Sequence, residues 1–165
     1  MSKKVAYGGI LLAVNIILLL FLNIIPTNTL LIMGLASLPI SIVIMEFGPK
    51  SGVAFYIASI VLGFIVMTNK SHWVIYVFTF GVYGLIKYII ERDLPVYVEI
   101  LLKLVFANIV LVFLYFILKP FLYIPVKLGL IAMFEVVFIL YDYMYSSFID
   151  YYNNKLKNKL IKIEK

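Results

Sequence analysis

The stretch LASLPISIVIMEFGPKSGVAFYIASIVLGF, residues 35–64, decides the fold of this chain. Two apolar arms flank the polar segment Gly48-Pro49-Lys50-Ser51-Gly52, which holds helix-breaking residues and one cation. As a helix, each arm approaches the hydrocarbon thickness of a bilayer, which is about 30 Å. The stretch therefore predicts a membrane hairpin of two antiparallel spans with a tight turn.

The composition of the whole chain supports the same class. Its 165 residues are 65% hydrophobic and 13% charged, with a mean hydropathy of +1.12, whereas soluble domains are about half apolar and a quarter charged. The apolar segments are continuous and lack the alternation of a β-barrel strand. We therefore predict an all-α, polytopic integral membrane protein, folded as a compact bundle.

Helix breakers divide the chain into six expected spans with short joints, so that neighbouring spans are antiparallel. The first follows a basic start but is too long for the apolar region of a signal peptide, and we interpret it as a retained span. We expect one transmembrane domain, residues 1–149, followed by a basic tail, residues 150–165, which can lie on the inner leaflet as an amphipathic helix. The expected spans are residues 5–25, 30–47, 53–68, 72–91, 97–118 and 128–148.

Basic residues set the expected orientation. The net charge of +6 does not indicate nucleic-acid binding, because the cations mark the membrane edges. With the N-terminus inside, the inner segments carry nine basic residues and the outer joints carry three, which favours a plasma-membrane protein with both termini in the cytoplasm. The inner residues are Lys3, Lys4, Lys50, Arg92, Lys155, Lys157, Lys159, Lys162 and Lys165, and the outer ones are Lys70, Lys119 and Lys127.

Catalytic signatures are absent from the sequence. The chain has no cysteine and one histidine, His72, and it lacks the H-E-x-x-H, G-x-S-x-G and P-loop patterns. We therefore expect no enzymatic activity, no metal site and no cofactor. Active transport by such a chain must draw its energy from a partner or from an ion gradient.

Polar residues inside the expected spans are informative because they are costly in lipid. Asn15 and Asn108 are predicted to cross-link helices. Glu135 has no basic partner in its own span, so it either pairs with a lysine of an outer joint or contacts a ligand.

Pro39 must kink or interrupt the second span, and the carbonyls it frees need partners from Ser37, Ser41 or a neighbouring helix. Lys87 with Glu91, and Glu99 with Lys103, have the i, i+4 spacing of ion pairs.

The outer half of the expected bundle collects amides, aromatic residues and the histidine. This mixture suits a small organic ligand with flat and polar parts. The alternative is an aromatic belt at the membrane interface, which explains Trp73 and Tyr123 well by themselves. The candidate substrate-binding residues are Asn23, Asn28, His72, Trp73, Tyr76, Asn108, Tyr115 and Glu135.

Two features resemble a known family. Gly9 and Ala13 place small residues four apart in the first span, and Leu38-Pro39 leads through Phe47-Gly48-Pro49-Lys50-Ser51-Gly52 to Gly63. In these features and in its layout the chain resembles the substrate-binding S components of energy-coupling factor (ECF) vitamin transporters, which have six spans and cytoplasmic termini. The resemblance implies a vitamin-like ligand near the outer face. It also implies that Gly9 and Ala13 dock on a transmembrane coupling protein, which works with ATPase subunits.

Two other functions stay open at this point. The first is a small structural or scaffolding membrane protein of envelope or cell-shape assembly, which needs no pocket. The second is an ion-coupled carrier, in which Glu135 or Asp142 would titrate.

Overall fold

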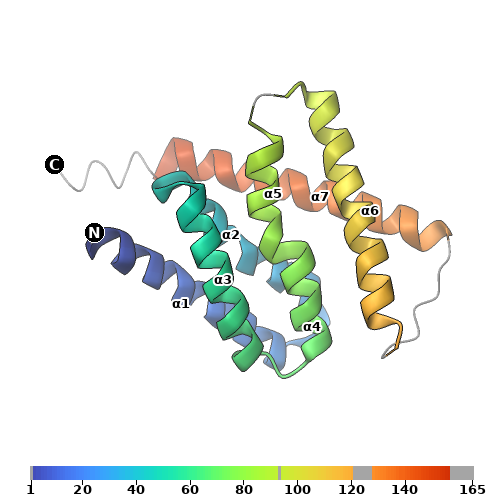
Figure 1. Cartoon of the computed structure of the whole chain (residues 1–165), viewed down its shortest axis with the longest axis horizontal. Coiled ribbons are helices and arrows are strands. Elements are labelled where there is room, and N and C mark those ends of the chain that lie inside the picture. Colours follow the sequence, from blue (N-terminus) through green and yellow to red (C-terminus); the bar gives the residue numbers. More distant parts are fainter. Residues whose placement is uncertain (1, 93, 121–127, 157–165) are drawn as a thin grey trace. The chain divides into compact units, whose positions relative to one another are not determined.

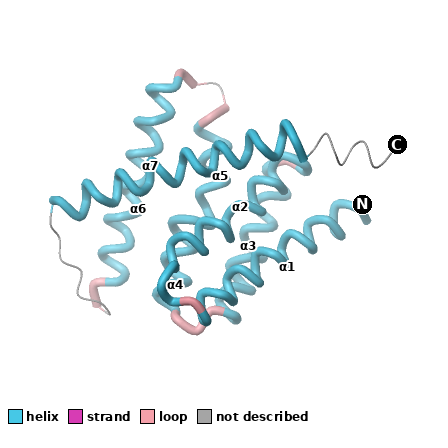
Figure 2. The backbone as a smooth tube through the Cα atoms, turned by 180° about the vertical axis from the view of Figure 1, so that it is seen from behind, coloured by secondary structure: helices cyan, strands magenta, loops and turns pink. Residues whose placement is uncertain are grey.

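The computed structural model describes residues 2–92, 94–120 and 128–156, and all of its elements are helical within those ranges. It divides into two compact units, residues 1–125 and 126–165. The order of elements is drawn in Figure 1, and Figure 2 shows short joints between α1 and α2, between α2 and α3, and between α3 and α4. The first unit contains α1 (Ser2–Ile24), the 3-10 turn η1 (Pro26–Asn28), α2 (Thr29–Phe47), α3 (Pro49–Val66), α4 (Lys70–Ile75), the π-helix η2 (Tyr76–Gly81), α5 (Val82–Ile90) and α6 (Val96–Leu118). The second contains α7 (Leu128–Tyr151) and the π-helix η3 (Tyr152–Leu156).

Six segments among the described residues are long and apolar enough to cross a membrane, which confirms the predicted all-α class and number of spans. The protein is a multi-pass membrane protein. Five of these spans, α1, α2, α3, α4 to α5, and α6, belong to the first unit. The packing of the sixth with the others into one domain, residues 1–149, stays a prediction. Most of the expected basic tail, residues 157–165, lies outside the described residues, as do Tyr123 and Lys127.

The turn of the hairpin formed by α2 and α3 is shorter than the sequence predicts. Gly48 alone separates α2 from α3, because Pro49 begins α3 and Lys50 to Gly52 form its first turn. Proline is well tolerated at the first helical position, where its missing N–H costs nothing. Gly48 has φ +84°, a conformation that favours glycine because it has no side chain. The predicted polar joint of five residues is therefore wrong in length, although its location is right.

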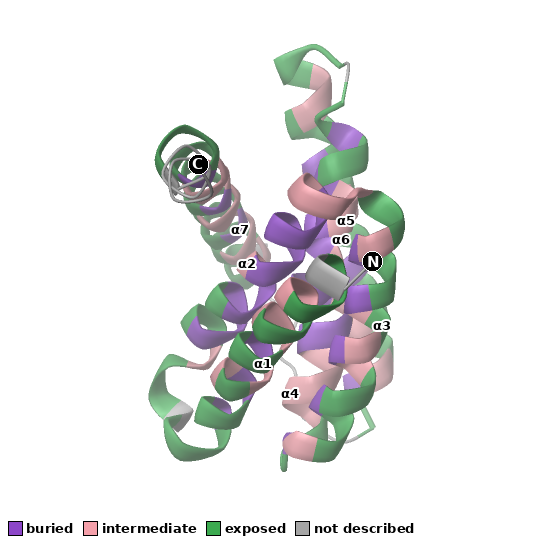
Figure 3. Cartoon of the chain, turned by 90° about the vertical axis from the view of Figure 1, so that its left-hand side faces the viewer, coloured by how far each residue is buried: buried purple, intermediate pink, exposed green. Residues whose placement is uncertain are grey.

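Helix α2 occupies the centre of the first unit. It contacts α1, α3, η2 and α5, and 56% of its most apolar window is buried, against 17% for the corresponding windows of α1 and α6. Figure 3 shows the buried residues concentrated along α2 and the faces turned toward it. At the end near Gly48, α2 and α3 approach so closely that a Cβ at Gly52 would overlap the side chain of Ile44. In lipid, such close packing stabilises the association of helices, because the hydrophobic effect that folds a soluble core does not act between them.

The fourth span differs from a regular helix. It begins at Lys70, two residues before the predicted start, because Asn69 caps it: the Asn69 Oδ1 accepts hydrogen bonds from the backbone N–H groups of Ser71 (3.0 Å) and His72 (3.4 Å). After six residues the helix widens into η2 before it continues as α5. A π-helical turn in mid-span is uncommon and often accompanies a functional site.

Candidate functional site

A closed set of hydrogen bonds, here called the Asn15 network, joins four helical segments in the middle of the first unit. The Asn15 Nδ2 donates to the carbonyl oxygen of Ala36 at 2.5 Å and to the Tyr76 hydroxyl at 2.8 Å. The Ser59 hydroxyl donates to the Asn15 Oδ1 at 2.7 Å and lies 3.0 Å from the Tyr76 hydroxyl. Each of these four residues is fully buried, with a relative exposure of 0%. The network thus ties α1, α2, α3 and η2 together.

Every side-chain hydrogen of this network has an acceptor inside the protein. Because the Ser59 proton goes to Asn15, the contact between Ser59 and Tyr76 must be donated by the tyrosine. Both amide hydrogens of Asn15 and both hydroxyl hydrogens are then used inside the protein. Such a satisfied network is the form in which polar groups persist in a dry interior. It stabilises and orients the helices, and it leaves no donor for a ligand.

This geometry confirms the prediction that Asn15 cross-links helices. It places Tyr76, which the sequence suggested as a ligand contact, in the core with its hydroxyl committed to Asn15 and Ser59. In the sequence, Ser59 stands out only as a small residue, four positions before Gly63. Its spacing to Gly63 indicated close packing, and no local signal pointed to a hydrogen-bonded partner 44 residues away in Asn15.

Side chains also satisfy carbonyls near Pro39, which lies inside a continuous α2. The Ser37 hydroxyl donates to the Gly34 carbonyl oxygen at 2.6 Å, and the Ser41 hydroxyl donates to that of Leu38 at 2.7 Å. The neighbouring helix contributes the Asn15 bond to Ala36. These bonds reach carbonyls near Pro39, whereas the carbonyl that its missing N–H frees is that of Leu35, four residues earlier. A partner for that freed carbonyl stays a prediction.

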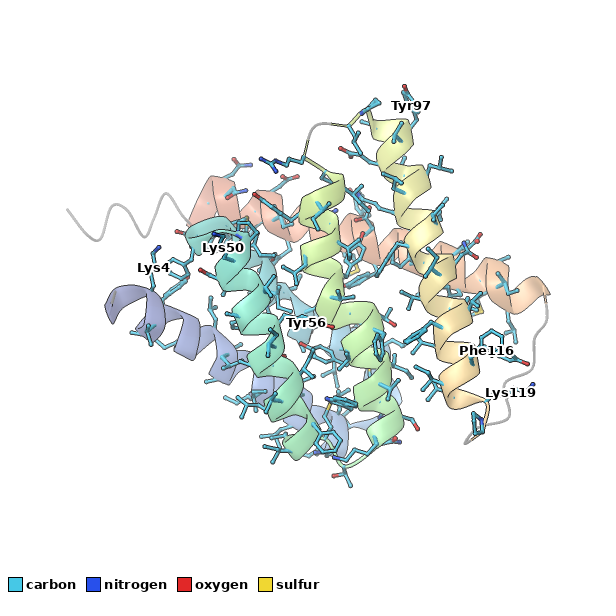
Figure 4. All side chains as sticks on the ribbon, viewed as in Figure 1. Lys4, Lys50, Tyr56, Tyr97, Phe116 and Lys119 are labelled. Atoms are coloured by element: carbon cyan, nitrogen blue, oxygen red, sulfur yellow. The ribbon has the colours of Figure 1, made fainter. Side chains whose placement is uncertain are left out.

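The π-helix η2 contains a buried hydroxyl group whose hydrogen-bonding capacity is not satisfied among the described residues. The Thr79 Oγ1 is buried and has no hydrogen-bond partner among the described residues, and the residue is only 6% exposed. An unsatisfied buried hydroxyl costs about 1–3 kcal/mol. The turn itself is braced by Tyr56 of α3, whose hydroxyl donates to the Val77 carbonyl oxygen at 2.9 Å. Figure 4 labels Tyr56 between α3 and the fourth span.

The Trp73 end, defined as the end of the first unit where α1 and α3 finish and α4 begins, holds two more candidate residues in backbone contacts. The Asn23 Nδ2 donates to the Val66 carbonyl oxygen at 2.9 Å, and its Oδ1 accepts from the Thr68 N–H at 3.0 Å. The Trp73 indole N–H donates to the Ile60 carbonyl oxygen at 3.0 Å. Both side chains therefore fix the joint between α3 and α4.

Lys70 completes the same end. Its ammonium group donates to the carbonyl oxygens of Phe64 and Met67 and lies 4.3 Å from the centre of the Phe64 ring. The Trp73 ring contacts the same Phe64 ring edge to face, with the two centroids 5.1 Å apart. A cation over an aromatic ring and at the carboxyl end of a helix is favourable on both counts.

The remaining candidate residues are distributed over several elements. His72 is half-buried in α4, and Asn28 is exposed at the end of η1. Tyr115 is half-buried on α6, with Lys119 over its ring at 5.6 Å. Asn108 is exposed and donates to the carbonyl of Leu104 in its own helix at 2.9 Å. Glu135 is half-buried on α7, in the second unit.

Segments α4 and α6 are neighbours, and the Phe78 and Phe113 rings meet edge to face with their centroids 4.8 Å apart. The structure therefore brings α6, which carries Tyr115, beside the segment that carries His72 and Trp73. Convergence of the whole predicted set, including Glu135, on one cavity stays a prediction.

A second polar group, the Lys87 cluster, consists of Lys87, Glu91 and Lys103. The Lys87 ammonium group lies 2.5 Å from the Glu91 Oε1, and the Lys103 ammonium group bonds the same oxygen. The two lysine side chains are 2% and 8% exposed, whereas the glutamate side chain is 31% exposed. The predicted i, i+4 pair of Lys87 with Glu91 is confirmed. Lys103 joins it from α6, a contact that its own spacing to Glu99 does not predict.

The small residues of α1 lie on the face opposite the Asn15 network. Gly9 and Ala13 are exposed, and a Cβ at Gly9 would meet no atom within 4 Å. In contrast, Asn15, Leu19 and Leu22 are buried on the other face. The face bearing Gly9 and Ala13 is therefore open within the described structure.

Among the described residues, no group of three or more histidine, aspartate or glutamate side chains is placed to hold a metal ion. Comparison with known proteins found no matching family, no matching curated protein and no matching solved structure.

Proposed function

We propose that this chain is the substrate-capture subunit of an ECF-type importer in the plasma membrane. In this proposal the Trp73 end faces outward and binds a small, vitamin-like molecule. Both termini lie in the cytoplasm, and α1 docks on a transmembrane coupling protein that is driven by partner ATPases. The positive-inside rule supports the orientation, since Lys4 and Lys50 lie at the same end of the first unit, labelled in Figure 4.

The observation that carries the proposal is the open, small-residue face of α1. Gly9 and Ala13 are exposed in the described structure, and small residues let another helix approach the backbone closely in a membrane. The opposite face of α1 is held in place by the buried Asn15 network. A rigidly held helix with a smooth outward face suits lateral docking on another membrane protein.

The Trp73 end supports the capture role as a braced platform. Asn23, Lys70 and Trp73 hold the backbone of the α3–α4 joint, and His72 on α4 is adjacent to that joint. In this proposal the ligand contacts come chiefly from His72, Asn28 and Tyr115, while Asn23, Trp73 and Tyr76 position the elements that carry them. An imidazole, an amide and a phenol ring suit a ligand with polar and flat parts.

Native mass spectrometry of the full chain, purified gently from its own membranes, tests both parts of the proposal. We expect a retained small molecule together with coupling and ATPase subunits. Gly9→Leu and Ala13→Leu should remove those subunits and keep the small molecule. Gly8→Leu is the matched control, because a Cβ at Gly8 also meets nothing within 4 Å while that position faces a different side of α1. Equal loss of subunits with Gly8→Leu would contradict docking through this face.

One observation favours a second function, a scaffolding role in envelope or cell-shape assembly. The polar groups of Asn23, Trp73 and Tyr76 are bonded within the protein, as expected if this end serves structure. A scaffold would also use the open face of α1, but it would carry no small molecule. Purified protein without a bound molecule, associated with envelope-assembly proteins through Gly9 and Ala13, would establish the scaffold and exclude capture.

A further inference from the structure

The fourth span is built in two parts that differ in how firmly they are held. Within α4 no residue is buried, whereas five of the six residues of η2 are buried, among them Tyr76, Thr79 and Gly81. The π-helix marks the boundary between α4, whose residues 71–75 are half-buried, and a mostly buried segment. We propose that η2 is a hinge, and that α4 turns about it between two positions.

The two positions differ by one residue of helical register. A π-helical turn contains more residues than an α-helical turn, so conversion of η2 to α geometry shifts the flanking helix by one residue. That shift rotates the helix by about 100° and moves it by about 1.5 Å along its axis. Because α4 has no buried residue, it is the side that moves. Tyr76 is the first residue of η2, so its hydroxyl bonds to Asn15 and Ser59 belong to the π position and oppose the shift.

The Thr79 hydroxyl favours conversion. A threonine in an α-helix commonly donates to the carbonyl three or four residues before it, which would be that of Tyr76 or Ile75. In the π geometry this bond is not made, and the buried Oγ1 has no partner among the described residues. Conversion to α geometry therefore gives Thr79 its hydrogen bond.

Other contacts favour the π position. The Trp73 indole bond to the Ile60 carbonyl and the ring contact with Phe64 fasten α4 to α3. The Tyr56 hydroxyl holds the Val77 carbonyl within η2. Since one state satisfies Thr79 and the other satisfies Trp73 and Tyr56, the two states compete. This inference concerns the chain's own conformations and does not depend on the proposed capture role.

A substitution at Gly81 shifts the same equilibrium between the π and α states. In the π state a Cβ at Gly81 would lie 3.1 Å from the Tyr76 carbonyl oxygen and 3.1 Å from the Tyr56 Cε2. A backbone oxygen cannot move aside cheaply, so Gly81→Ala disfavours the π state. In α geometry the Tyr76 carbonyl faces residue 80 instead. Thr79→Val acts in the opposite direction, because it removes the hydroxyl that gains a partner on conversion.

Pulsed electron–electron resonance on the full chain in lipid nanodiscs measures the two positions. Spin labels are attached at Ser71→Cys on α4 and Ile24→Cys at the end of α1, and the chain has no native cysteine to compete. We expect two label-to-label distances. Thr79→Val should lower the population at the second distance by about five-fold, the weight of one hydrogen bond. Gly81→Ala should raise that population.

Thr79→Ser is the control, because it keeps the hydroxyl and should keep both distances in near wild-type proportion. Circular dichroism checks that each variant retains its helix content. A single distance in the wild-type protein would overturn the hinge. It would also be overturned if Thr79→Val and Gly81→Ala failed to move the second population in opposite directions.

Discussion

The Asn15 network and the Lys87 cluster solve the same problem in different ways. Both bring polar side chains from separate helices together within a membrane domain. The network is neutral, fully buried and closed, with each side-chain hydrogen donated to a protein acceptor. The cluster is charged, and its shared carboxylate at Glu91 is 31% exposed. The neutral groups are thus fully buried, whereas the charged cluster reaches the surface at Glu91.

The physical reason is the cost of charge in a medium of low dielectric. A neutral amide or hydroxyl needs only its hydrogen-bond partners to be stable in a dry interior. An ammonium group also needs a counter-charge, and long lysine side chains reach toward the interface to find water. Glu91 directly follows the last residue of α5, so the carboxylate reaches solvent while the lysine stems stay buried.

The largest effect is expected from Glu91→Gln. It removes the only charge compensation that the cluster itself provides for two buried lysines. Breaking a fully buried pair costs about 3–5 kcal/mol. Because the carboxylate is partly exposed, we discount this cost and expect about 2–3 kcal/mol of destabilisation. Reversible unfolding in mixed micelles, followed by circular dichroism, measures it.

Glu99→Gln is the matched control for that variant. Glu99 has the i, i+4 spacing to Lys103, and the same substitution there should change the free energy of unfolding by less than about 0.5 kcal/mol. An equal loss for both variants would show that Glu99 compensates Lys103 as much as Glu91 does. The charged cluster would then extend further along α6.

A smaller effect is expected from Asn15→Leu, which keeps the branched shape and the number of side-chain heavy atoms but opens the network. Ser59 and Tyr76 lose a shared partner while they stay buried. Interhelical hydrogen bonds in membranes contribute less than their number suggests, so we expect about 1–2 kcal/mol of destabilisation. The same unfolding assay applies. Asn28→Leu should be nearly neutral, because Asn28 is exposed and its side chain makes no capping hydrogen bond to α2.

The smallest effect is a coupling between Ser59 and Tyr76. In a double-mutant cycle of Ser59→Ala and Tyr76→Phe, the two losses should not add, because both changes break the same closed ring. We expect a coupling free energy of about 0.6 kcal/mol, typical of membrane hydrogen bonds. Strict additivity would mean that the two hydroxyls act independently and that the network is not cooperative.

Much of the fold follows from local sequence. Six apolar runs, each long enough for a bilayer, set the number of spans, and Lys87 with Glu91 pair as their spacing predicts. The prediction for the length of the α2–α3 turn was wrong because it treated proline as a helix breaker, whereas Pro49 starts α3. The candidate ligand-binding residues were chosen by residue type. Residue type does not distinguish a core tyrosine such as Tyr76 from one that faces a ligand.

The class, the spans and the location of the α2–α3 hairpin follow from the sequence alone, because only a long, apolar helical segment can cross the hydrocarbon layer. Only the tertiary structure decided which spans are central. Helix α6 is more apolar than α2, yet 17% of its window is buried against 56% for α2, since lipid and protein interior are equally apolar surroundings for a side chain. It also decided the partners of Asn15, because Tyr76 is 61 residues away in the chain. Hydrogen bonds at that separation depend on how the helices pack, and no local pattern encodes them.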